Sequence, residues 1–459
     1  MTKDITKKVL GAAVVIGFIL PTVFWSLSAP RKSEELVAGA EVVTEVTAMP
    51  APEDAAIANV SSAEVVKGAS ESVGNGVDRL PAAAEDRPNV ILIMIDDAGL
   101  TWAPVPTPSI TKLVSSGTKF GQSYGQPNCS PARAQLMTSQ YSGKWGHTSN
   151  PPKPIPAAIE TWPKLLRSSG VHTGFVGKWH IEGRSPSEAG FDATPLYFLE
   201  GHHDYFDNAT LLSGNGPAPK VADHLTDRFA AAAVKFINNN KGKADPFFLY
   251  LAPNAVHLPD QTEARFQKAC ASLPNAAQRA YCGNVLHVDE LVGKVVAAAP
   301  ANTLIIFTAD NGCTYLQPAC HNGQLRGSKN STFEGGIRVP LAMSWKGVIP
   351  ANTTFRQPVS HRDLGPTILS VMKAQSLKTA DGKNILPAIV GKAPLPERHL
   401  LNGGDTNGTI RNNRWKWRVT GELFDLQNDP GEKIDVASKN RDVAAELKQT
   451  RESIARDWK

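Results

Sequence analysis

The stretch "NVILIMIDDAG", residues 89 to 99, contains an unbroken apolar run from Val90 to Ile95 and then turns acidic. A second stretch of the same kind, "NTLIIFTADNG" at 302 to 312, follows more than two hundred residues later, with its apolar run from Leu304 to Phe307. Continuous apolar runs of this length are typical of strands buried on both faces of a parallel sheet. The two stretches therefore predict two buried strands of a sheet that is covered on both sides.

Helical and strand patterns alternate between these two runs. "DHLTDRFAAAAVKFINNN" (223–240) predicts a helix, and "HTGFVG" (172–177) and "PFFLYLA" (246–252) predict further strands. Such alternation predicts an α/β domain. From about Ala374 the chain changes character, because apolar residues alternate in "RWKWRVTGELFDLQNDPGE" (414–432) and favour antiparallel strands.

The two buried runs end in Asp96 and Asp97 and in Asp310 and Asn311. In sheets of this class ligands bind beyond the carboxyl ends of the strands, where we expect both pairs to lie. Three carboxylates converging there would repel one another without a cation, and Ca²⁺ or, less favoured, Mg²⁺ suits all-oxygen ligation. Zinc is disfavoured because neither pair contains cysteine or histidine. The alternative is that each pair is an ordinary set of loop residues at the start of a helix.

The stretch "SYGQPNCSPARAQLMTSQY" (123–141) places the first cysteine of the chain, Cys129, at the predicted start of a helix. Ser130 and Pro131 predict an N-cap followed by a proline at the first helical position. Cys129 would then lie at the positive end of the helix dipole, with Arg133 one turn along on the same face. Two interpretations stay open for this stretch, a reactive nucleophile and a buried structural cysteine.

The N-terminus has the pattern of an export signal. Lysines precede an apolar run from Val9 to about Ala29, and a basic pair follows the run. Its length is close to the roughly 20 residues that span a bilayer, which favours residues 9 to 29 as a retained membrane anchor over cleavage after Ser28. The expected location is periplasmic or otherwise extracytoplasmic. A buried core helix within residues 1 to 32 is the alternative.

Charge is spread unevenly along a chain whose formal net charge is +5. Residues 33 to 86 contain eleven Asp and Glu against two Lys and Arg and lack aromatic residues, which predicts a disordered acidic spacer. We expect a main domain over 87–373 and a C-terminal subdomain over 374–459, and this part of the chain is basic. This excess of positive charge favours an anionic substrate or surface, although a basic face exposed to solvent would account for the same excess. No nucleic-acid partner is expected.

Four further cysteines lie in the second half of the chain: Cys270, Cys282, Cys313 and Cys320. In an exported protein they would form two local pairs, Cys270 with Cys282 and Cys313 with Cys320, each closing a short loop. Other pairings, or four free thiols, are the alternatives. The local pairing leaves Cys129 alone, and an odd cysteine in an oxidising compartment draws attention to its chemistry.

Nine motifs of this chain, in the order in which they occur, resemble those of the cysteine-type, formylglycine-dependent sulfatase family. They are "DDAG", "TPSITKL", "CSPARAQLMT", "GKWH", "PFFLYLAPNAVHLP", "FTADNG", "LRGSKNSTFEGGIRVP", "VSHRDLGPTIL" and "ELFDLQNDPGE". Each alone is a weak match, but nine in order from Asn89 onward are strong evidence. The resemblance implies the α/β fold of the alkaline phosphatase superfamily, a large, mixed, mostly parallel sheet sandwiched by helices, with a small C-terminal antiparallel-sheet subdomain.

The resemblance also implies a metal site and a modified residue. The calcium ligands of the family match the four residues at the ends of the apolar runs: Asp96, Asp97, Asp310 and Asn311. Cys129 matches the cysteine that a maturation enzyme oxidises to formylglycine, an aldehyde that is itself a metal ligand. The implied cofactors are thus Ca²⁺ and formylglycine made from Cys129.

The mechanism implied by the resemblance begins when one hydroxyl of the hydrated aldehyde attacks the sulfur of a sulfate ester. Arg133 matches the arginine that holds the hydrate, and the remaining polar residues around the sulfate match Lys178, His180, His257 and Lys329. His257 or Lys329 would protonate the leaving alcohol. His180 would take the proton of the second hydroxyl, which expels sulfate and restores the aldehyde.

We therefore expect an exported sulfatase that hydrolyses sulfate monoesters, of a sulfated carbohydrate more than of a small aryl sulfate. One alternative is a phosphonate or phosphate ester hydrolase of the same superfamily, which Lys178, His180 and Lys329 disfavour. The other is a tethered protein that binds sulfated glycans without turnover. At 137 to 140 the family commonly has leucine, threonine, glycine and arginine, whereas this chain reads "MTSQ", with Ser139 at the glycine position.

Overall fold

The structure is a computed structural model of the whole chain. It describes residues 86–102, 105–206, 210–317, 319–456 and 458. The chain divides into two units, Met1–Asn75 and Gly76–Lys459, and every described residue belongs to the second. The predicted signal or anchor (1–32) and the acidic spacer (33–86, apart from Asp86) lie outside the described residues. Among the described residues, no helix combines the length and the apolar character needed to span a bilayer.

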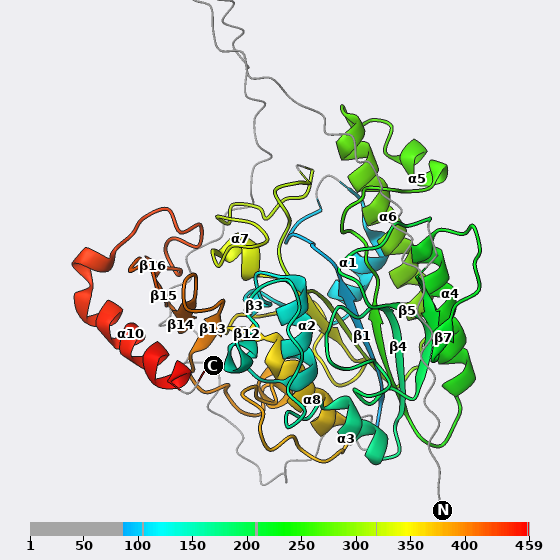
Figure 1. Ribbon diagram of the computed structural model, residues 1–459, viewed down its shortest axis with the longest axis horizontal. Coiled ribbons are helices and arrows are strands. Elements are labelled where there is room, and N and C mark those ends of the chain that lie inside the picture. Colours follow the sequence, from blue (N-terminus) through cyan, green and yellow to red (C-terminus); the bar gives the residue numbers. More distant parts are fainter. Residues whose placement is uncertain (1–85, 103–104, 207–209, 318, 457, 459) are drawn as a thin grey trace, which may run out of the picture. The chain divides into compact units, whose positions relative to one another are not determined.

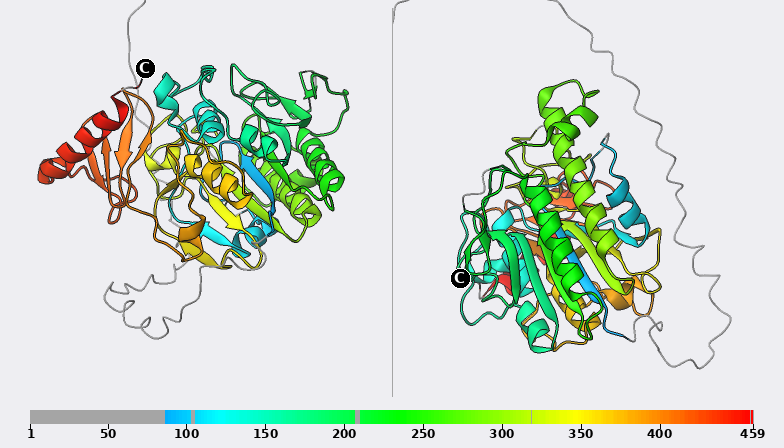
Figure 2. Two further views of the ribbon diagram at one scale, coloured as in Figure 1. Left: turned by 90° about the horizontal axis from the view of Figure 1, so that it is seen from below. Right: turned by 90° about the vertical axis from the view of Figure 1, so that its right-hand side faces the viewer.

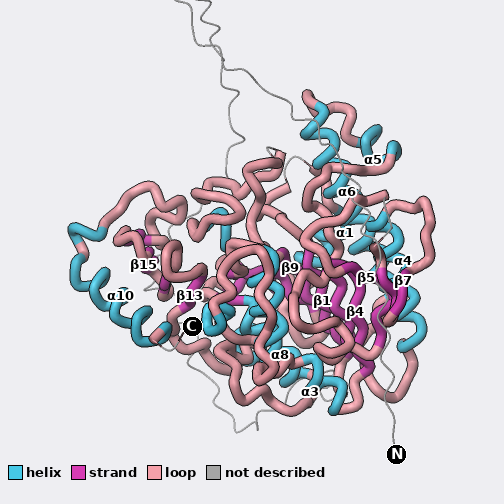
Figure 3. Tube along the Cα trace, viewed as in Figure 1, coloured by secondary structure: helices cyan, strands magenta, loops and turns pink. Residues whose placement is uncertain are grey.

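A ten-stranded sheet lies at the centre of the described residues (Figures 1 and 3). Its strands are β1 (Asn89–Ile95), β2 (Thr118–Phe120), β4 (His172–Lys178), β5 (Ala193–Phe198), β6 (Leu212–Ser213), β7 (Gly216–Pro217), β8 (Phe247–Ala252), β9 (Thr303–Ala309), β10 (Leu341–Ser344) and β11 (Thr353–Phe355). They lie in the order β11-β2-β10-β9-β1-β8-β4-β5-β6-β7. β1 pairs parallel with β8 and β9, β4 parallel with β8 and β5, and β10 antiparallel with β9 and β2. The sheet is mixed and mostly parallel, as the sequence predicted.

Helices cover both faces of this sheet, and Figure 2 shows α4 and α6 side by side over one of them. The α-helices are α1 (Pro108–Ser115), α2 (Cys129–Thr138), α3 (Pro163–Ser168), α4 (Leu225–Asn240), α5 (Ala264–Ala269), α6 (Ala276–Ala298), α7 (Glu334–Ile337), α8 (Leu364–Val371), α9 (Leu386–Ile389) and α10 (Arg441–Ala455). The described residues also contain the short 3₁₀ helices η2 (Ser142–Trp145), η3 (His361–Asp363) and η4 (Ala437–Lys439).

The unbroken apolar run of β1 serves two cores. Val90, Leu92 and Met94 pack in one core with residues of α2, α3 and α8, whereas the alternate residues of the strand pack in another core with α1, α4 and α6. Each fully buried aliphatic side chain of this kind contributes roughly 1.5–3 kcal/mol. A strand with polar residues on one face could not occupy this central position.

Two smaller sheets accompany the large one. β3 (Ser123–Tyr124) pairs with β12 (Val359–Ser360), and the C-terminal sheet consists of β13 (Leu400–Asn402), β14 (Thr409–Arg411), β15 (Trp415–Arg418) and β16 (Leu423–Asp425). The C-terminal sheet is antiparallel throughout, as predicted, and α10 lies beside it (Figure 1). The division of the chain at about residue 374 stays a prediction.

Both predicted disulfides form. Cys270 is bonded to Cys282, which joins the end of α5 to α6, and Cys313 is bonded to Cys320 in the loop after β9. Cys129 is the free cysteine, and it is buried.

Helix α2 begins two residues earlier than predicted. Its N-cap is Asn128, with extended backbone (φ −141°, ψ 151°), so that Ser130 is not the N-cap and Pro131 is the third helical residue. The prediction was wrong because proline is tolerated throughout the first helical turn, where the backbone N–H has no acceptor within the helix. Cys129 is thus the first residue of α2.

Helix α2 ends at Thr138, and its C-cap Ser139 adopts the left-handed conformation with φ 54° and ψ 22°. The residue is completely buried, and its hydroxyl has no hydrogen-bond partner among the described residues. A residue with a Cβ atom is strained in this conformation by about 1 kcal/mol, whereas glycine is not. The glycine of the family pattern would fit this position without strain.

We predict that Ser139→Gly raises the free energy of unfolding by about 1 kcal/mol, because it relieves this strain and removes a buried unpaired hydroxyl. Urea denaturation measures the change. Ser139→Ala is the control, since it removes the hydroxyl but keeps the Cβ atom. The backbone explanation fails if the alanine variant is as stable as the glycine variant.

Candidate active site

The two acidic pairs lie side by side because the strands that carry them are neighbours. β1 and β9 are parallel and in register, with Ile95 opposite Ala309, so that both end at the same edge of the sheet. The backbone N–H of Asp97 donates to Oδ1 of Asp310 at 3.1 Å. The Asn311 amide donates from Nδ2 to Oδ1 of Asp97 at 2.7 Å. The structure therefore brings together the four residues that the sequence singled out as metal ligands.

Cys129 lies at this same edge, at the first position of α2. Its Sγ is 3.4 Å from Oδ1 of Asp96 and 3.6 Å from Oδ1 of Asp97. Burial, and then the charges of Asp310 and Asp96, raise the pKa of the Cys129 thiol well above its ordinary value. The unmodified side chain is a protonated thiol in this setting.

Three cationic side chains neutralise the three carboxylates. Arg133 donates to Oδ2 of Asp310 from Nη2 at 2.8 Å and from Nε at 3.2 Å, and the Lys178 ammonium pairs with Asp96. Lys329 donates to Oδ2 of Asp97 at 2.8 Å. Burial alone would raise the pKa of Asp96, but the charges around it, with Lys178 the strongest, lower it to about 2. The site therefore holds full charges of both signs away from water.

Two histidines complete the predicted set. His257 lies with Nε2 3.1 Å from Nζ of Lys329 and 3.4 Å from Oδ2 of Asp97. His180 is buried, and burial followed by the charges of Lys178 and Arg133 lowers its pKa to about 2, so its ring is uncharged at neutral pH. Gly201 packs against this ring so closely that a Cβ atom would lie 2.9 Å from Nε2.

The donor atoms at this edge suit a cation. Ligand atoms of Asp96, Asp97, Cys129 and His257 lie within 4.8 Å of one another. Oδ1 of Asn311 is buried and has no hydrogen-bond partner among the described residues, which is costly for an amide oxygen unless something else binds it. A hard cation would satisfy this oxygen. His257 was predicted as a polar residue around the sulfate and, with Lys329 as the alternative, as the proton donor, and the geometry adds it to the atoms near the candidate metal position.

Sequence reasoning did not identify the side chains that hold His257 in place. The Tyr205 hydroxyl lies 3.0 Å from the carbonyl oxygen of Asn254 and 2.9 Å from that of His257. Gln317 donates from Nε2 to the Val256 carbonyl at 2.8 Å. Nothing in the sequence around Tyr205 or Gln317 marks them, because their partners lie more than forty residues away.

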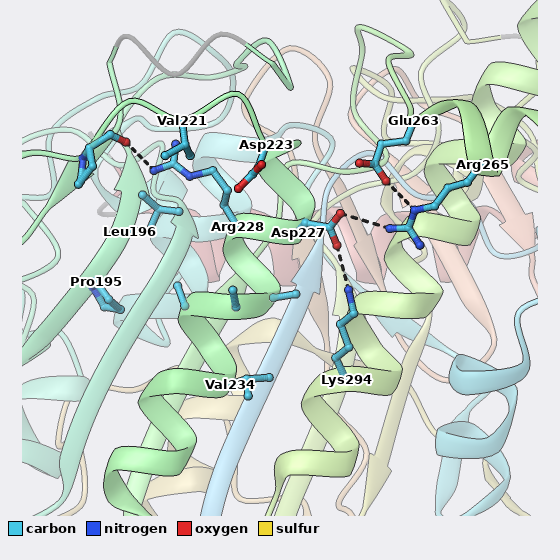
Figure 4. A pocket seen from close by; sticks show the side chains of 14 residues that line it. Pro195, Leu196, Val221, Asp223, Asp227, Arg228, Val234, Glu263, Arg265 and Lys294 are labelled. Carbon is cyan, nitrogen blue, oxygen red and sulfur yellow. Dashed lines mark hydrogen bonds and ion pairs between the residues drawn. The ribbon is translucent and has the colours of Figure 1, made fainter.

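A surface hollow of about 860 Å³ lies against α4, and none of the predicted site residues lines it (Figure 4). Asp227 in this hollow accepts hydrogen bonds from Arg265 at 3.2 Å and from Lys294 at 3.0 Å. Asp227 also belongs to a second group that could hold a metal, with Glu263 and His287. We assign no metal there, because both carboxylates already accept hydrogen bonds from Arg265 or Lys294 and, unlike Oδ1 of Asn311, no buried oxygen of this group lacks a partner.

Comparison with known proteins identifies the family. The Sulfatase family model matches residues 88–374. N-acetylgalactosamine-6-sulfatase of Mus musculus is 28% identical over 417 residues, which cover 77% of this chain and 78% of that protein. Arylsulfatase J of Mus musculus is 29% identical over 384 residues, covering 74% of this chain and 62% of that protein.

The fold is matched by solved structures as well. The crystal structure of Ps i-CgsB in complex with k-i-k-neocarrahexaose superimposes with a TM-score of 0.77 at 32% sequence identity, over 82% of this chain and 94% of that one. The family model covers every residue at the sheet edge that carries Cys129. The chain therefore belongs to the sulfatase family of the alkaline phosphatase superfamily, and it is a sulfuric ester hydrolase.

Proposed function

We propose that this protein hydrolyses sulfate monoesters of a carbohydrate, with formylglycine made from Cys129 as the nucleophile and one Ca²⁺ ion as cofactor. The observation that carries the proposal is the convergence of three acidic and three cationic side chains on the buried Cys129 at one edge of the sheet. Membership of the sulfatase family makes the sulfate ester the substrate class.

The proposed calcium ligands are the oxygen donors at the strand ends and the modified residue itself: Asp96, Asp97, Asp310, Asn311 and residue 129. The unpartnered Oδ1 of Asn311 supports this assignment. The all-oxygen character of the four strand-end residues favours Ca²⁺, with Mg²⁺ second. Without the ion, three carboxylates balance three cations. With the ion the site becomes positive overall, which suits an anionic sulfate group.

The hydrated aldehyde would supply the attacking hydroxyl, and the calcium ion would supply positive charge for the sulfate oxygens. Side chains of the protein would stabilise the developing charge and transfer the protons. Arg133, Lys178 and Lys329 neutralise negative charge that develops on the sulfate. His257 and Lys329, whose nitrogens lie 3.1 Å apart, are in reach of one another to share the proton that the leaving alcohol needs. His180, uncharged at neutral pH, is available as the proton acceptor.

A carbohydrate is the favoured substrate. The chain from residue 87 onward is basic, and the similar Ps i-CgsB structure is a complex with k-i-k-neocarrahexaose. The proposal includes a maturation enzyme that modifies Cys129 and export to the periplasm or another extracytoplasmic space. It also includes attachment to the membrane through residues 9 to 29 if this segment is not cleaved.

We predict that the matured protein releases sulfate from at least one member of a panel of sulfated oligosaccharides, and that Cys129→Ala lowers kcat/KM by at least ~10³-fold. Ion chromatography of free sulfate measures the rate, and matched phosphate esters are the control. Faster release of phosphate than of sulfate would identify a phosphate ester hydrolase instead. Tight binding of the panel without release of sulfate would identify a binding protein.

We predict that Asn311→Ala weakens Ca²⁺ binding by at least about tenfold, because it removes an oxygen donor that has no other partner in the part of the chain that the structure describes. Isothermal titration of the chelator-treated protein measures the affinity. Asn238→Ala, at an exposed position of α4, is the matched control and should bind Ca²⁺ like the unaltered protein. Equal affinity in the two variants would remove Asn311 from the ligand set.

We predict that His257→Ala slows hydrolysis of a sugar sulfate by about 10²-fold or more but affects a nitrophenyl sulfate much less, since a nitrophenolate leaves without a proton. Steady-state kinetics with both substrates measures the ratio. His172→Ala, at the opposite end of β4 from Lys178, is the matched control. Equal losses on both substrates would contradict a role for His257 in protonating the leaving group.

A further inference from the structure

Two chain segments next to the active site are hydrogen-bonded to one another. The entry segment, residues 123–128, leads into Cys129, and the lysine segment, residues 326–338, carries Lys329. The Asn330 N–H donates to the Pro127 carbonyl at 2.8 Å, and the Gly125 N–H donates to the Ile337 carbonyl at 2.9 Å. A displacement of either segment would therefore move the other.

The C-terminal sheet and its loops are hydrogen-bonded to both segments. Asn402 of β13 donates from Nδ2 to the Gly125 carbonyl at 2.6 Å, and the Gly403 N–H donates to Oε1 of Gln126 at 3.0 Å. On the lysine segment, Thr332 donates from Oγ1 to the Asn407 carbonyl at 2.5 Å. The entry segment and the lysine segment are thus each tied to the chain beyond residue 400.

A buried charge cluster lies at the centre of this contact. Nζ of Lys416, on β15, is 3.0 Å from Oε1 of Glu334 and 2.8 Å from Oε1 of Glu432. The Tyr124 hydroxyl donates to Oε2 of Glu334 at 2.7 Å, and Arg411 of β14 donates to the Tyr124 hydroxyl. All five side chains are at most 1% exposed.

The charges in this cluster depend on one another. Burial would raise the pKa of Glu334, but the charges of Lys416, Arg411 and Arg338 outweigh burial and hold it below its ordinary value. Removing one partner leaves an unpaired buried charge, which is far more costly than removing a hydrogen bond at the surface. The cluster therefore specifies one arrangement of Tyr124 and Glu334 relative to β14 and β15.

We propose that the C-terminal sheet is a positioning device for the active site, in which Tyr124, Glu334 and Lys416 hold the entry segment and the lysine segment so that Cys129 and Lys329 face each other across the acidic pairs. The side-chain hydrogen bonds and ion pairs that join the cluster reach none of the proposed metal ligands, and its residues act through the two segments. The effect on turnover rests on the proposed function, whereas the effect on the two segments does not.

The sharpest test is Tyr124→Phe, which keeps the ring and removes the hydroxyl that links Glu334 to Arg411. Tyr141→Phe is the matched control, because Tyr141 is also buried and its hydroxyl also bonds the C-terminal part of the chain, at the His399 carbonyl (3.2 Å), but away from both segments. The readouts are hydrogen exchange at the Lys329 and Asn330 amides, both hydrogen-bonded, and kcat and KM for a sulfate ester.

In Tyr124→Phe we expect both amides to exchange about tenfold faster and kcat to fall with little change in KM, while Tyr141→Phe leaves all of these unchanged. Lys416→Met should have a larger effect of the same kind, whereas Lys416→Arg, which keeps the positive charge, should leave exchange and kcat close to those of the unaltered protein.

Unchanged exchange in Tyr124→Phe, or equal acceleration in Tyr141→Phe, would overturn the inference. Faster exchange with unchanged kcat would also overturn it, since the cluster would then be structural only. Absence of sulfate release from the unaltered protein would overturn the proposed function, while the exchange result would still decide whether the cluster holds the two segments.

Discussion

Three carboxylates forced together at one edge of a sheet are the constraint on which the rest of this structure depends. β1 and β9 are parallel neighbours, so Asp96, Asp97 and Asp310 meet where the two strands end. At such distances like charges repel by several kcal/mol unless they are neutralised. Arg133, Lys178 and Lys329, which come from three separate parts of the chain, supply that neutralisation. A helix, a strand end and a loop thus each place one positively charged side chain beside the three carboxylates.

Sequence patterns predicted the parts of this arrangement that have a local signal. The unbroken apolar runs identified β1 and β9, because a strand that packs against helices on both faces has no polar side. The acidic residues after each run, together with the ordered motifs around Cys129, identified the residues that the structure brings together. The start of α2 was predicted wrongly, since Pro131 is tolerated anywhere in the first turn and does not fix the N-cap.

The residues that hold the site in place have no local sequence pattern from which they could have been predicted. Tyr205 and Gln317 hold the segment that carries His257 through hydrogen bonds that span 52 and 61 residues of the chain. Lys416 is completely buried between Glu334 and Glu432, although a lysine in an alternating strand pattern reads as a solvent-facing residue. Long-range partners of this kind can be found only when the fold is known. They explain why the C-terminal sheet matters to a site whose residues all precede it in the chain.

The proposed mechanism depends on the modification of Cys129, which can be measured directly. The tryptic peptide from Phe120 to Arg133 contains this residue as its only cysteine. Mass spectrometry of this peptide, taken from protein made in its own host, distinguishes a thiol from an aldehyde or its hydrate. We expect the aldehyde or its hydrate to be the main form. A peptide that contains only the unmodified thiol, from a host shown to mature another sulfatase, would contradict it.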